Sequence, residues 1–282
     1  MKNKKLAIIG GSGFIGKHLV KHFGKKNIVV LSSKKKEGFE FFDLKKKINI
    51  NKFKDTLKGV EVIVFCSSLK IANNKNKIYN FNYIYFKNFL KVFRKLKKKL
   101  IYLSTASIYP KNSNLSCKEN TKILTNSMSG NFYAYTKYLA EKEIIKVLKK
   151  KTYLILRIGA IYGLNDNSNF LDRCLKNLKN NKKIKFEKPL SIKFNFLHVD
   201  QLIHCIDFML RKKKFGIYNI GNYKYISLND LIKNIRKLYL NPNIQFYKDK
   251  NNSKSLKYFI NFSMSKLKNT KYKFKKSRKF LC

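Results

Sequence analysis

Short apolar runs alternate with longer amphipathic segments along most of the chain. The apolar runs predict β-strands at residues 6–9, 28–31, 40–42, 62–65, 100–103 and 153–157. The amphipathic segments predict helices at residues 14–23, 78–96, 132–148, 170–178 and 199–210. Alternation of this kind is typical of a parallel sheet with crossover helices, so we predict an α/β fold with a doubly wound parallel sheet.

The alternation loosens after Gly163, and only three prolines occur, so no proline-rich linker divides the chain. We predict one large domain over residues 1–162, to which residues 196–222 return. Residues 163–195 and 223–282 are predicted to form a small substrate-binding region at the carboxyl-terminal side. The segment KNTKYKFKKSRKF near the end is interpreted as a basic tail.

A glycine-rich loop follows the first predicted strand and opens the first predicted helix, in the sequence LAIIGGSGFIG. Glycines allow the tight turn and let backbone N–H groups approach a pyrophosphate, whose charge the helix N-terminus favours. The strand–loop–helix context predicts a dinucleotide-binding domain of the Rossmann type. The cofactor-binding residues expected here are Gly10, Gly13, Phe14, Ile15 and Gly16.

The end of the second predicted strand bears on which nicotinamide cofactor binds. NAD-preferring sites usually place Asp or Glu there to bind the ribose 2′-hydroxyl. This chain has Ser32 and Ser33, followed by Lys34 and Lys35. Hydroxyl and ammonium groups bind a 2′-phosphate that a carboxylate would repel, so we predict NADP, with NAD as the alternative because lysine is abundant everywhere.

The net charge of +49 taken alone would indicate nucleic acid or an anionic surface as the partner. Only six of the 64 basic residues are arginine, however, and arginine is the better residue for bidentate recognition of phosphates and bases. The lysines are also spread over the whole chain. We therefore do not expect nucleic acid to be the main partner.

The cysteines and the apolar runs exclude several other classes of protein. Five scattered cysteines without a C-x-x-C pair predict neither a disulfide framework nor a metal site, and they fit a cytoplasmic location. No apolar run reaches the roughly 18 residues that a membrane span needs. The run LAIIG is shorter than the roughly 7 to 15 residues of a secretion signal, so we interpret it as a strand.

These segments together resemble the extended short-chain dehydrogenase/reductase family, in its branch of nucleotide-sugar epimerases, dehydratases and reductases. GGSGFIG resembles the glycine loop of that family, and FFDL places Asp43 and Leu44 where the family contacts adenine. VEVIVFCSS resembles the fourth strand, with Cys66 and Ser67 lining the cofactor, and Asn82 matches an asparagine of the following helix. LRIGAIYG, FNFLHVDQL and GIYNIGN resemble later landmarks in the right order.

The resemblance also selects one Y-x-x-x-K pattern among several, of which we compare those at residues 83–87, 133–137 and 272–276. LIYLSTASIYP resembles the fifth strand of the family, whose catalytic hydroxyl corresponds to Thr105. Only residues 133–137 follow Thr105 at a crossover distance and open a predicted helix. The resemblance therefore implies that Thr105, Tyr133 and Lys137 are the catalytic residues.

The chemistry of a Tyr–Lys pair agrees with this assignment. Four residues apart on a helix, Tyr133 and Lys137 lie on one face. A tyrosine has a pKa near 10, and we expect the ammonium group to lower it so that the phenol can exchange a proton at a sugar oxygen while hydride moves at the nicotinamide. Lys137 would also hold the nicotinamide ribose, and Thr105 would orient the substrate oxygen.

Departures from the family narrow the reaction. Dehydratases of this branch carry Asp-Glu after the catalytic threonine, where this chain has Ala106 and Ser107. Ser107 also replaces the cysteine that the fucose-synthase type uses for epimerisation at C3 and C5. What remains is NADPH reduction of a 4-keto nucleotide sugar, or alternatively an NAD-dependent C4 epimerase resembling UDP-glucose 4-epimerase.

A second alternative is a non-catalytic NADP- or RNA-binding protein on the same fold. For the enzyme, we expect substrate contacts at Ser68, Ser107 and Tyr133 and within residues 163–195, and no metal ion. The family also implies a homodimer formed through the helices that flank the sheet, among them the helix that carries Tyr133. We expect Asp200 to cap the helix that begins there.

Overall fold

A seven-stranded parallel sheet forms the centre of the computed structural model, with the strand order β11-β6-β5-β4-β1-β2-β3. The structure describes residues 5–70, 74–110, 116–128, 131–163, 171, 174, 176–177, 180, 182, 184–186, 193–238, 244–246 and 260–274. The sheet strands are β1 (Leu6–Ile9), β2 (Ile28–Ser32), β3 (Glu40–Phe41), β4 (Val62–Phe65), β5 (Lys99–Thr105), β6 (Tyr153–Ile158) and β11 (Gly216–Ile220). The predicted doubly wound parallel sheet is confirmed. Its order reverses between β1 and β4, which is where α/β sheets of this kind form their binding crevice.

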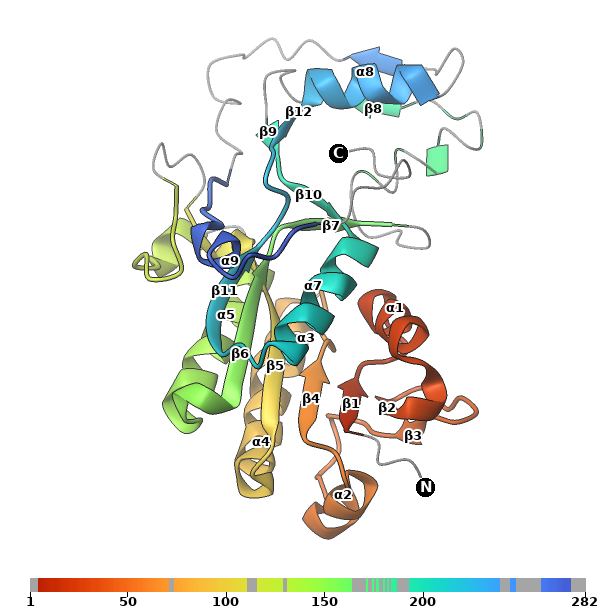
Figure 1. Ribbon diagram of the computed structural model, residues 1–282, viewed down its shortest axis with the longest axis vertical. Helices are drawn as coiled ribbons and strands as arrows, with labels where there is room; N and C mark the ends of the chain where they lie inside the picture. The colour runs from red at the N-terminus through yellow and green to blue at the C-terminus, as the bar shows by residue number, and fades with distance from the viewer. Residues whose placement is uncertain are drawn as a thin grey trace.

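Helices cover both faces of the sheet (Figure 1). On one face lie α1 (Phe14–Phe23) and α7 (Val199–Arg211), and the short α9 (Ser265–Lys268) packs against the same apolar cluster. On the other face lie α2 (Ile50–Thr56), α4 (Tyr85–Phe93) and α5 (Phe132–Val147). The short α3 (Lys75–Tyr79) continues through a π-helical turn (Asn80–Ile84) into α4. The sheet is therefore the middle of three layers.

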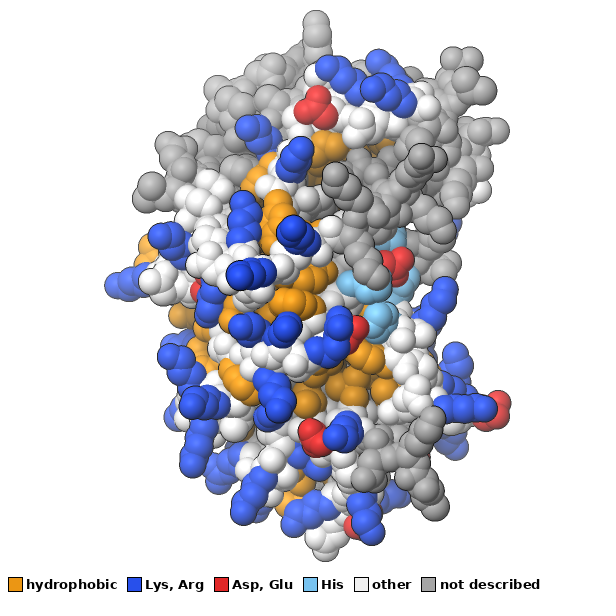
Figure 2. Space-filling model, viewed as in Figure 1, with side chains coloured by type: hydrophobic (Ala, Val, Ile, Leu, Met, Phe, Trp, Pro, Cys, Tyr) orange, Lys and Arg blue, Asp and Glu red, His pale blue; other side chains and the backbone are white. Residues whose placement is uncertain are grey.

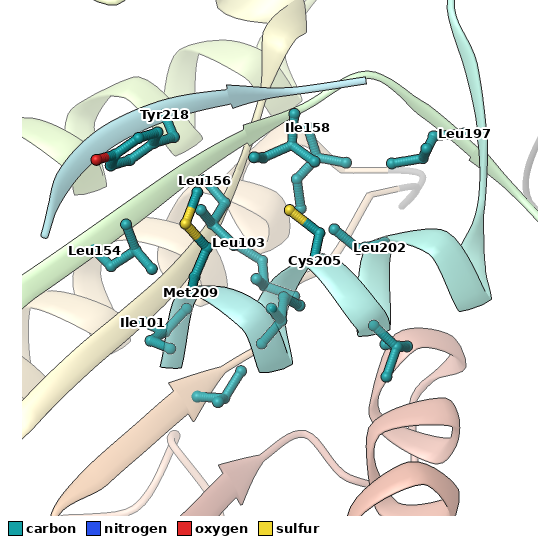
Figure 3. Packing of buried hydrophobic residues seen from close by; sticks show 14 of the residues in the cluster. Ile101, Leu103, Leu154, Leu156, Ile158, Leu197, Leu202, Cys205, Met209 and Tyr218 are labelled. Carbon is teal, nitrogen blue, oxygen red and sulfur yellow. The ribbon is translucent and has the colours of Figure 1, made fainter. Parts of the chain in front are cut away.

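The packing of α7 shows how the helical layer that contains α1 and α7 is attached to the sheet (Figure 3). Leu202, Cys205 and Met209 follow one another at helical spacing and are fully buried. They lie against apolar side chains of β5 and β6, among them Leu103 and Leu156. Side chains that alternate along each strand supply one face to this cluster and the other face to the cluster under α4 and α5.

The predicted elements agree with the observed strands and helices along the first 160 residues, with ends that are identical or differ by up to three residues. The helix predicted for residues 170–178 is described only at 171, 174, 176 and 177, which are helical. Elements that we did not predict include α2, β11 and α8 (Leu228–Leu238). The predicted cap is wrong, because His198 rather than Asp200 is the N-cap of α7 and accepts a hydrogen bond from the Asp200 N–H at 3.2 Å.

Three small two-stranded sheets accompany the main one. They pair β7 (Ala160–Tyr162) with β10 (Phe196–His198), β9 (Lys193–Phe194) with β12 (Ile226–Ser227), and β8 (Ile184–Phe186) with β13 (Ile244–Phe246). Figure 1 places α8 and these short strands beyond the carboxyl ends of the main sheet. Residues 260–274 return to the sheet, where Lys266 Nζ donates to the Ile217 carbonyl oxygen at 2.7 Å.

Lysine and arginine are scattered over the face shown in Figure 2 rather than gathered in one patch. The histidines stand out on this face because they lie together over α1 and α7. His18 contacts Asp200 and His22 contacts Asp207, each at 3.0 Å, and these pairs join the two helices. Over the described ranges, none of the helices has the length and apolarity that crossing a lipid bilayer requires.

Candidate active site

A cavity of about 790 Å³ opens at the carboxyl ends of the central strands. Most of the predicted site residues line it. These are Gly10, Gly13, Phe14, Ile15, Ser32, Ser33, Asp43, Leu44, Cys66, Ser67, Ser68, Thr105, Ser107 and Tyr133. Four others, Gly16, Lys34, Asn82 and Lys137, do not line it, and each has a different position in the structure.

The glycine loop is packed so tightly that larger residues would not fit. Gly10 has a φ of +90°, and a Cβ there would lie 2.8 Å from the backbone nitrogen of Ser67. A Cβ on Gly16 would lie 2.1 Å from the Gly10 carbonyl oxygen, so Gly16 supports the loop from behind without lining the cavity. The loop thus turns from β1 into α1 with its backbone close to the cavity, as a pyrophosphate-binding loop requires.

Ser32, Ser33 and Lys34, at the end of β2, differ in what their side chains contact. Ser32 is buried, and its hydroxyl donates to Ser12 Oγ at 2.8 Å and accepts from the Lys34 N–H at 3.0 Å. Ser33 lines the cavity, and so does Asp43, whose carboxylate accepts from the Lys45 N–H at 3.0 Å. The Lys34 side chain is exposed and is not part of the wall. Ser32 and Ser33 thus both line the cavity, but the Ser32 hydroxyl is already held by two hydrogen bonds within the protein.

Asn82 holds the loop after β4 in place instead of reaching the cavity. Its side chain accepts from the Leu69 N–H and donates to the Leu69 carbonyl oxygen, both at 2.8 Å. It also donates to Thr136 Oγ1 on α5 at 3.2 Å. The π-helical turn places Asn82 at this junction, as such turns often do at functional sites. The loop it holds carries Ser67 and Ser68.

The predicted catalytic hydroxyls lie on one wall of the cavity. Thr105 ends β5, and its Oγ1 accepts from the Ser107 N–H at 3.1 Å within the 3₁₀ turn Ala106–Ile108. Tyr133 lies in the first turn of α5, which begins at its cap residue Asn131. Burial raises the pKa of the Tyr133 phenol, and a hydrogen bond with Ser68 offsets part of this effect. Tyr133 is therefore protonated at neutral pH.

Lys137 lies one helical turn after Tyr133 and is only 2% exposed. Its Nζ lies 3.9 Å from the centroid of the Tyr102 ring, and among the residues that the structure describes it has no hydrogen-bond or ion-pair partner. Burial lowers the pKa of Lys137 to about 7, although Glu141 and then Cys66 act to raise it. An ammonium group buried without a partner is costly, and such groups are typical of functional sites.

The expectation that Lys137 lowers the pKa of Tyr133 is wrong for the charges of the protein itself. The phenol pKa is raised, and Lys137 is not among the groups that shift it. The reason is that the Lys137 Nζ lies over the ring of Tyr102 and that burial reduces its own charge near neutral pH. The two residues share a helix face, but only Tyr133 reaches the cavity wall.

The patterns at residues 83–87 and 272–276 lie away from the cavity, and neither Tyr138 nor Lys142, a further Y-x-x-x-K pair within α5, lines it. Tyr83 donates to Glu143 Oε1 at 3.4 Å, and Lys87 forms an ion pair with the same carboxylate at 3.6 Å. Tyr272 is buried against α7, and its partner in the third pattern, Lys276, lies outside the described residues. Neither tyrosine lines the cavity. Residues 133–137 are therefore the Y-x-x-x-K pattern whose tyrosine lines the cavity.

Several residues of the wall were not predicted from the sequence. They are Ile9, Ser12, Phe42, Lys70, Phe81, Leu103, Ser104, Ala106, Asn131, Ile158, Gly159, Ala160, Ile161, Ile260 and Phe262, whereas Lys193, Phe194 and Asn195 fall within the predicted substrate region 163–195. Phe42 could have been found, because it stands beside Asp43 in FFDL. Phe262 could not, because a single bridge to Cys117 brings it to the cavity from far along the chain. Most of the expected substrate region 163–195 lies outside the described residues.

Charge is unevenly distributed around the wall. Asp43 is its one carboxylate, and Lys70 and Lys193 are its basic side chains, as far as the described residues extend. Within those residues no group of three or more His, Cys, Asp or Glu side chains could hold a metal ion. The chemistry that the wall offers is therefore hydroxyl, phenol and ammonium chemistry.

Proteins similar in sequence or structure to this chain include nucleotide-sugar enzymes. A relative of another class, the decarboxylating sterol-4-alpha-carboxylate 3-dehydrogenase of Mus musculus, is 32% identical over 58% of this chain and 48% of the relative. ADP-L-glycero-D-manno-heptose-6-epimerase of Brachyspira hyodysenteriae is 26% identical, over 86% of this chain and 83% of the relative. UDP-N-acetylglucosamine 4-epimerase from Methanobrevibacter ruminantium, solved with UDP-N-acetylmuramic acid, has a TM-score of 0.79 at 18% identity and covers 98% and 94% of the two chains. dTDP-4-dehydrorhamnose reductase from Bacillus anthracis, solved with NADP, has a TM-score of 0.74 at 18% identity and covers 97% and 95%.

At these identities the two solved structures show the shared fold alone. The sequence of the chain shows the family, because a family model described as the NAD dependent epimerase/dehydratase family matches residues 6–221. That match runs from β1 to the residue after β11 and so spans the whole main sheet. The chain therefore belongs to the NAD dependent epimerase/dehydratase family.

Proposed function

We propose that the protein is a reductase that uses NADPH to reduce a 4-keto nucleotide sugar. The observation that carries the proposal is the position of Tyr133. It shares one cavity wall with Thr105 and with the glycine loop, and the buried ammonium group of Lys137 lies one turn behind it. Three separate stretches of sequence thus bring together, at one cavity, the groups that carbonyl reduction needs.

The residues of the cavity fit a nicotinamide dinucleotide. Gly10 and Gly16 let the loop pack closely against its surroundings, because a Cβ at either position would meet backbone atoms, and the loop backbone then lies beside the cavity where a pyrophosphate would bind. Ser33, Asp43 and Leu44 would hold the adenosine end. The Lys137 ammonium group does not line the cavity as it lies over the Tyr102 ring, and it would have to turn from that ring to bind the nicotinamide ribose. The bound cofactor would supply the hydride.

Tyr133 would supply the proton that completes the reduction. Hydride adds to the carbonyl carbon, and the phenol proton passes to the carbonyl oxygen, so that a ketone becomes a secondary alcohol. The raised pKa of Tyr133 favours this direction, because the phenol is in its acid form at neutral pH. Thr105 would orient the carbonyl oxygen through its hydroxyl, and Ser68 would stabilise the phenolate that remains.

Dehydration is a weaker proposal for this site. Ala106 and Ser107 line the cavity at the positions where the dehydratases of the branch that this chain resembles carry Asp and Glu. Neither side chain can act as a carboxylic acid. A site without those acids retains simple redox chemistry at one carbon.

C4 epimerisation with NAD is the second candidate, and one observation favours it. The Lys34 side chain is exposed and does not line the cavity, which weakens the argument for a bound 2′-phosphate. An epimerase would instead oxidise the C4 alcohol, keep NADH bound, and return the hydride to the other face. Tyr133 would then act first as a base.

The test uses the purified full-length chain with NADPH or NADH and a panel of UDP-, dTDP-, ADP- and GDP-linked 4-keto sugars. The proposal predicts that NADPH is oxidised in equimolar amounts with the formation of one 4-hydroxy nucleotide sugar. Copurified NAD together with interconversion of C4 epimers, without net oxidation of NADPH, would replace the reductase with the epimerase. Failure to bind either cofactor would overturn both.

A further inference from the structure

A phenylalanine from the carboxyl-terminal segment closes one end of the cavity. Phe262 lines the cavity and is 3% exposed. A Cβ added to Gly159 would lie 3.2 Å from the Phe262 Cζ atom, and one added to Gly221 would lie 2.8 Å from it. The tip of the ring therefore occupies space that these two glycines leave open, directly after the strands β6 and β11 end.

Hydrogen bonds on both sides fix the backbone that carries this ring. The Cys117 N–H donates to the Asn261 carbonyl oxygen at 3.0 Å, and the Ser263 N–H donates to the Cys117 carbonyl oxygen at 2.8 Å. The Phe262 N–H donates to the Tyr225 hydroxyl at 3.0 Å, and that hydroxyl donates to the Phe262 carbonyl oxygen at 3.2 Å. The ring is thus held at the cavity by a bonded backbone and does not move aside easily for a ligand.

The ring lies close to the position where the sugar carbonyl would react. Ile158 ends β6 and is the register partner of Thr105, which ends β5. Neighbouring strands lie about 4.8 Å apart, so Gly159 and the ring tip against it are one strand away from Thr105. A sugar whose carbonyl oxygen is bonded to the Thr105 hydroxyl would therefore place a neighbouring substituent of its ring against Phe262.

The side chains at this end of the cavity offer apolar surface. Ile158, and Ile260 two residues before Phe262, also line the cavity. Asn195 is polar, but its Oδ1 accepts from the Asn222 N–H at 2.7 Å and its Nδ2 donates to the Asn222 carbonyl oxygen at 2.8 Å. A sugar hydroxyl placed here would lose bonds to water without gaining bonds to these side chains, whereas a methyl group would lose none.

The basic side chains of the wall have a different environment. Lys70 and Lys193 are exposed, whereas Phe262 and Ile158 are buried. Exposed ammonium groups suit an anionic diphosphate, which they bind as point charges. The cavity thus has charge where it is open to solvent and apolar surface at its closed end.

We propose that Phe262 is a specificity-determining residue. Its ring selects a sugar that carries a hydrogen atom or a methyl group at the carbon facing it, and it disfavours a hydroxymethyl or carboxylate group there. The inference rests on the proposed function, because it places the sugar carbonyl at Thr105. The matched family region ends at residue 221 and so assigns nothing to Phe262.

The first test compares matched ligands on the wild-type chain. Glucose and 6-deoxyglucose differ in a hydroxymethyl against a methyl group at one carbon, and each is supplied linked to UDP, dTDP, ADP or GDP. Calorimetry with saturating NADP⁺ should show that the 6-deoxy ligand binds roughly tenfold more tightly or better, for the nucleotide that the chain accepts. Equal affinities of the two ligands would overturn the proposal.

The second test changes the ring itself. Phe262→Ala opens space in which water can accompany the hydroxyl, so the preference for the 6-deoxy ligand should fall below about threefold while NADP⁺ affinity stays at the wild-type level. Phe274→Ala is the matched control and should keep the wild-type preference, because Phe274 packs against Tyr223 and Tyr272 in the same segment and does not line the cavity. An unchanged preference in Phe262→Ala would show that another part of the wall sets it.

These outcomes separate the inference from the proposed function. A chain that prefers the 6-deoxy ligand but oxidises no NADPH with any 4-keto sugar would retain the role of Phe262 and lose the reductase assignment. A chain that reduces 4-keto sugars but binds both ligands equally would retain the reductase and lose the role of Phe262. If Phe262→Ala does not fold, Phe262→Leu replaces it, and the comparison on the wild-type chain is unaffected.

Discussion

Asn82 holds Leu69 by both of its backbone polar groups, with two hydrogen bonds of 2.8 Å. This contact fixes the loop that carries Ser67 and Ser68 at the cavity wall, and a third bond ties the Asn82 side chain to Thr136 on α5. Asn82, which we predicted to bind the cofactor, therefore does not line the cavity and instead holds the loop that forms part of its wall. Its importance can be measured without any substrate.

Asn82→Ala should lower both stability and cofactor affinity. The substitution leaves the part-buried Leu69 N–H and carbonyl group without partners, and we expect the free energy of unfolding to fall by about 1–3 kcal/mol. Urea denaturation measures this loss, and calorimetry measures the weaker NADPH binding. Asn80→Ala, in the same π-helical turn but exposed, should stay within about 0.5 kcal/mol of the wild type. Equal stability of the two variants would contradict the role given to Asn82.

Gly10→Ala should be far more disruptive than Gly13→Ala. The first places a Cβ 2.8 Å from Ser67 N at a φ of +90°, whereas the second meets nothing closer than 3.3 Å. The left-handed backbone alone adds about 1–2 kcal/mol for a residue with a Cβ. Thermal unfolding and NADPH titration of the two variants check the difference. If Gly10→Ala binds NADPH as the wild type does, the loop does not have the packing described here.

Lys137→Met should stabilise the fold while it abolishes cofactor binding. Because the pKa of Lys137 is lowered from 10.5 to about 7, the unfolded chain binds more protons than the folded one between those pH values. The contribution of Lys137 to the free energy of unfolding of the wild type is thus least favourable at pH 7 and below, and the wild type gains stability as the pH rises toward 10.5. We expect Lys137→Met to be more stable by on the order of a few kcal/mol at pH 6.5, with the difference shrinking at higher pH.

Denaturation at several pH values checks this slope, and Lys87→Met is its control. The Lys87 side chain is 40% exposed and pairs with Glu143, so its replacement should change stability by less than about 1 kcal/mol and without that pH dependence. A difference between Lys137→Met and the wild type that does not vary with pH would mean that Lys137 keeps an ordinary pKa.

Ser33→Asp should shift the cofactor preference from NADPH toward NADH. A carboxylate at this position of the wall would repel a 2′-phosphate and accept a bond from a 2′-hydroxyl. We expect the ratio of NADH to NADPH affinity to rise by roughly tenfold or more, since about 1.4 kcal/mol corresponds to a factor of ten. Lys26→Glu, an exposed charge change before β2, controls for the general electrostatic field. The same shift in both variants would rule out a local effect of Ser33.

The fold could be predicted from local patterns, because alternating apolar runs and the glycine loop are signals within short windows. The strand β11 was missed because GIYNI is a short segment that becomes a strand only beside β6. The helix α2 has seven residues with lysines at two of them, and such a short helix gives little periodicity.

The site was predictable in part, for a related physical reason. The cavity residues carried by motifs at the strand ends were found, because those ends meet at one edge of a parallel sheet. The link between Glu141 and Arg157 depends on how α5 lies across β5 and β6, which no spacing in the sequence encodes. The burial of Tyr133 also depends on packing, and this burial raises the Tyr133 pKa, whereas we expected Lys137 to lower it.

The most direct measurement compares Tyr133→Phe with Tyr83→Phe. Both variants remove one hydroxyl from a Y-x-x-x-K tyrosine, but only Tyr133 lines the cavity. The rate of NADPH oxidation with the accepted 4-keto nucleotide sugar should fall by about 10²–10⁴-fold in Tyr133→Phe at unchanged NADPH affinity, and should remain at the wild-type level in Tyr83→Phe. A Tyr133→Phe enzyme that keeps the wild-type rate would contradict the proposal that Tyr133 delivers the proton.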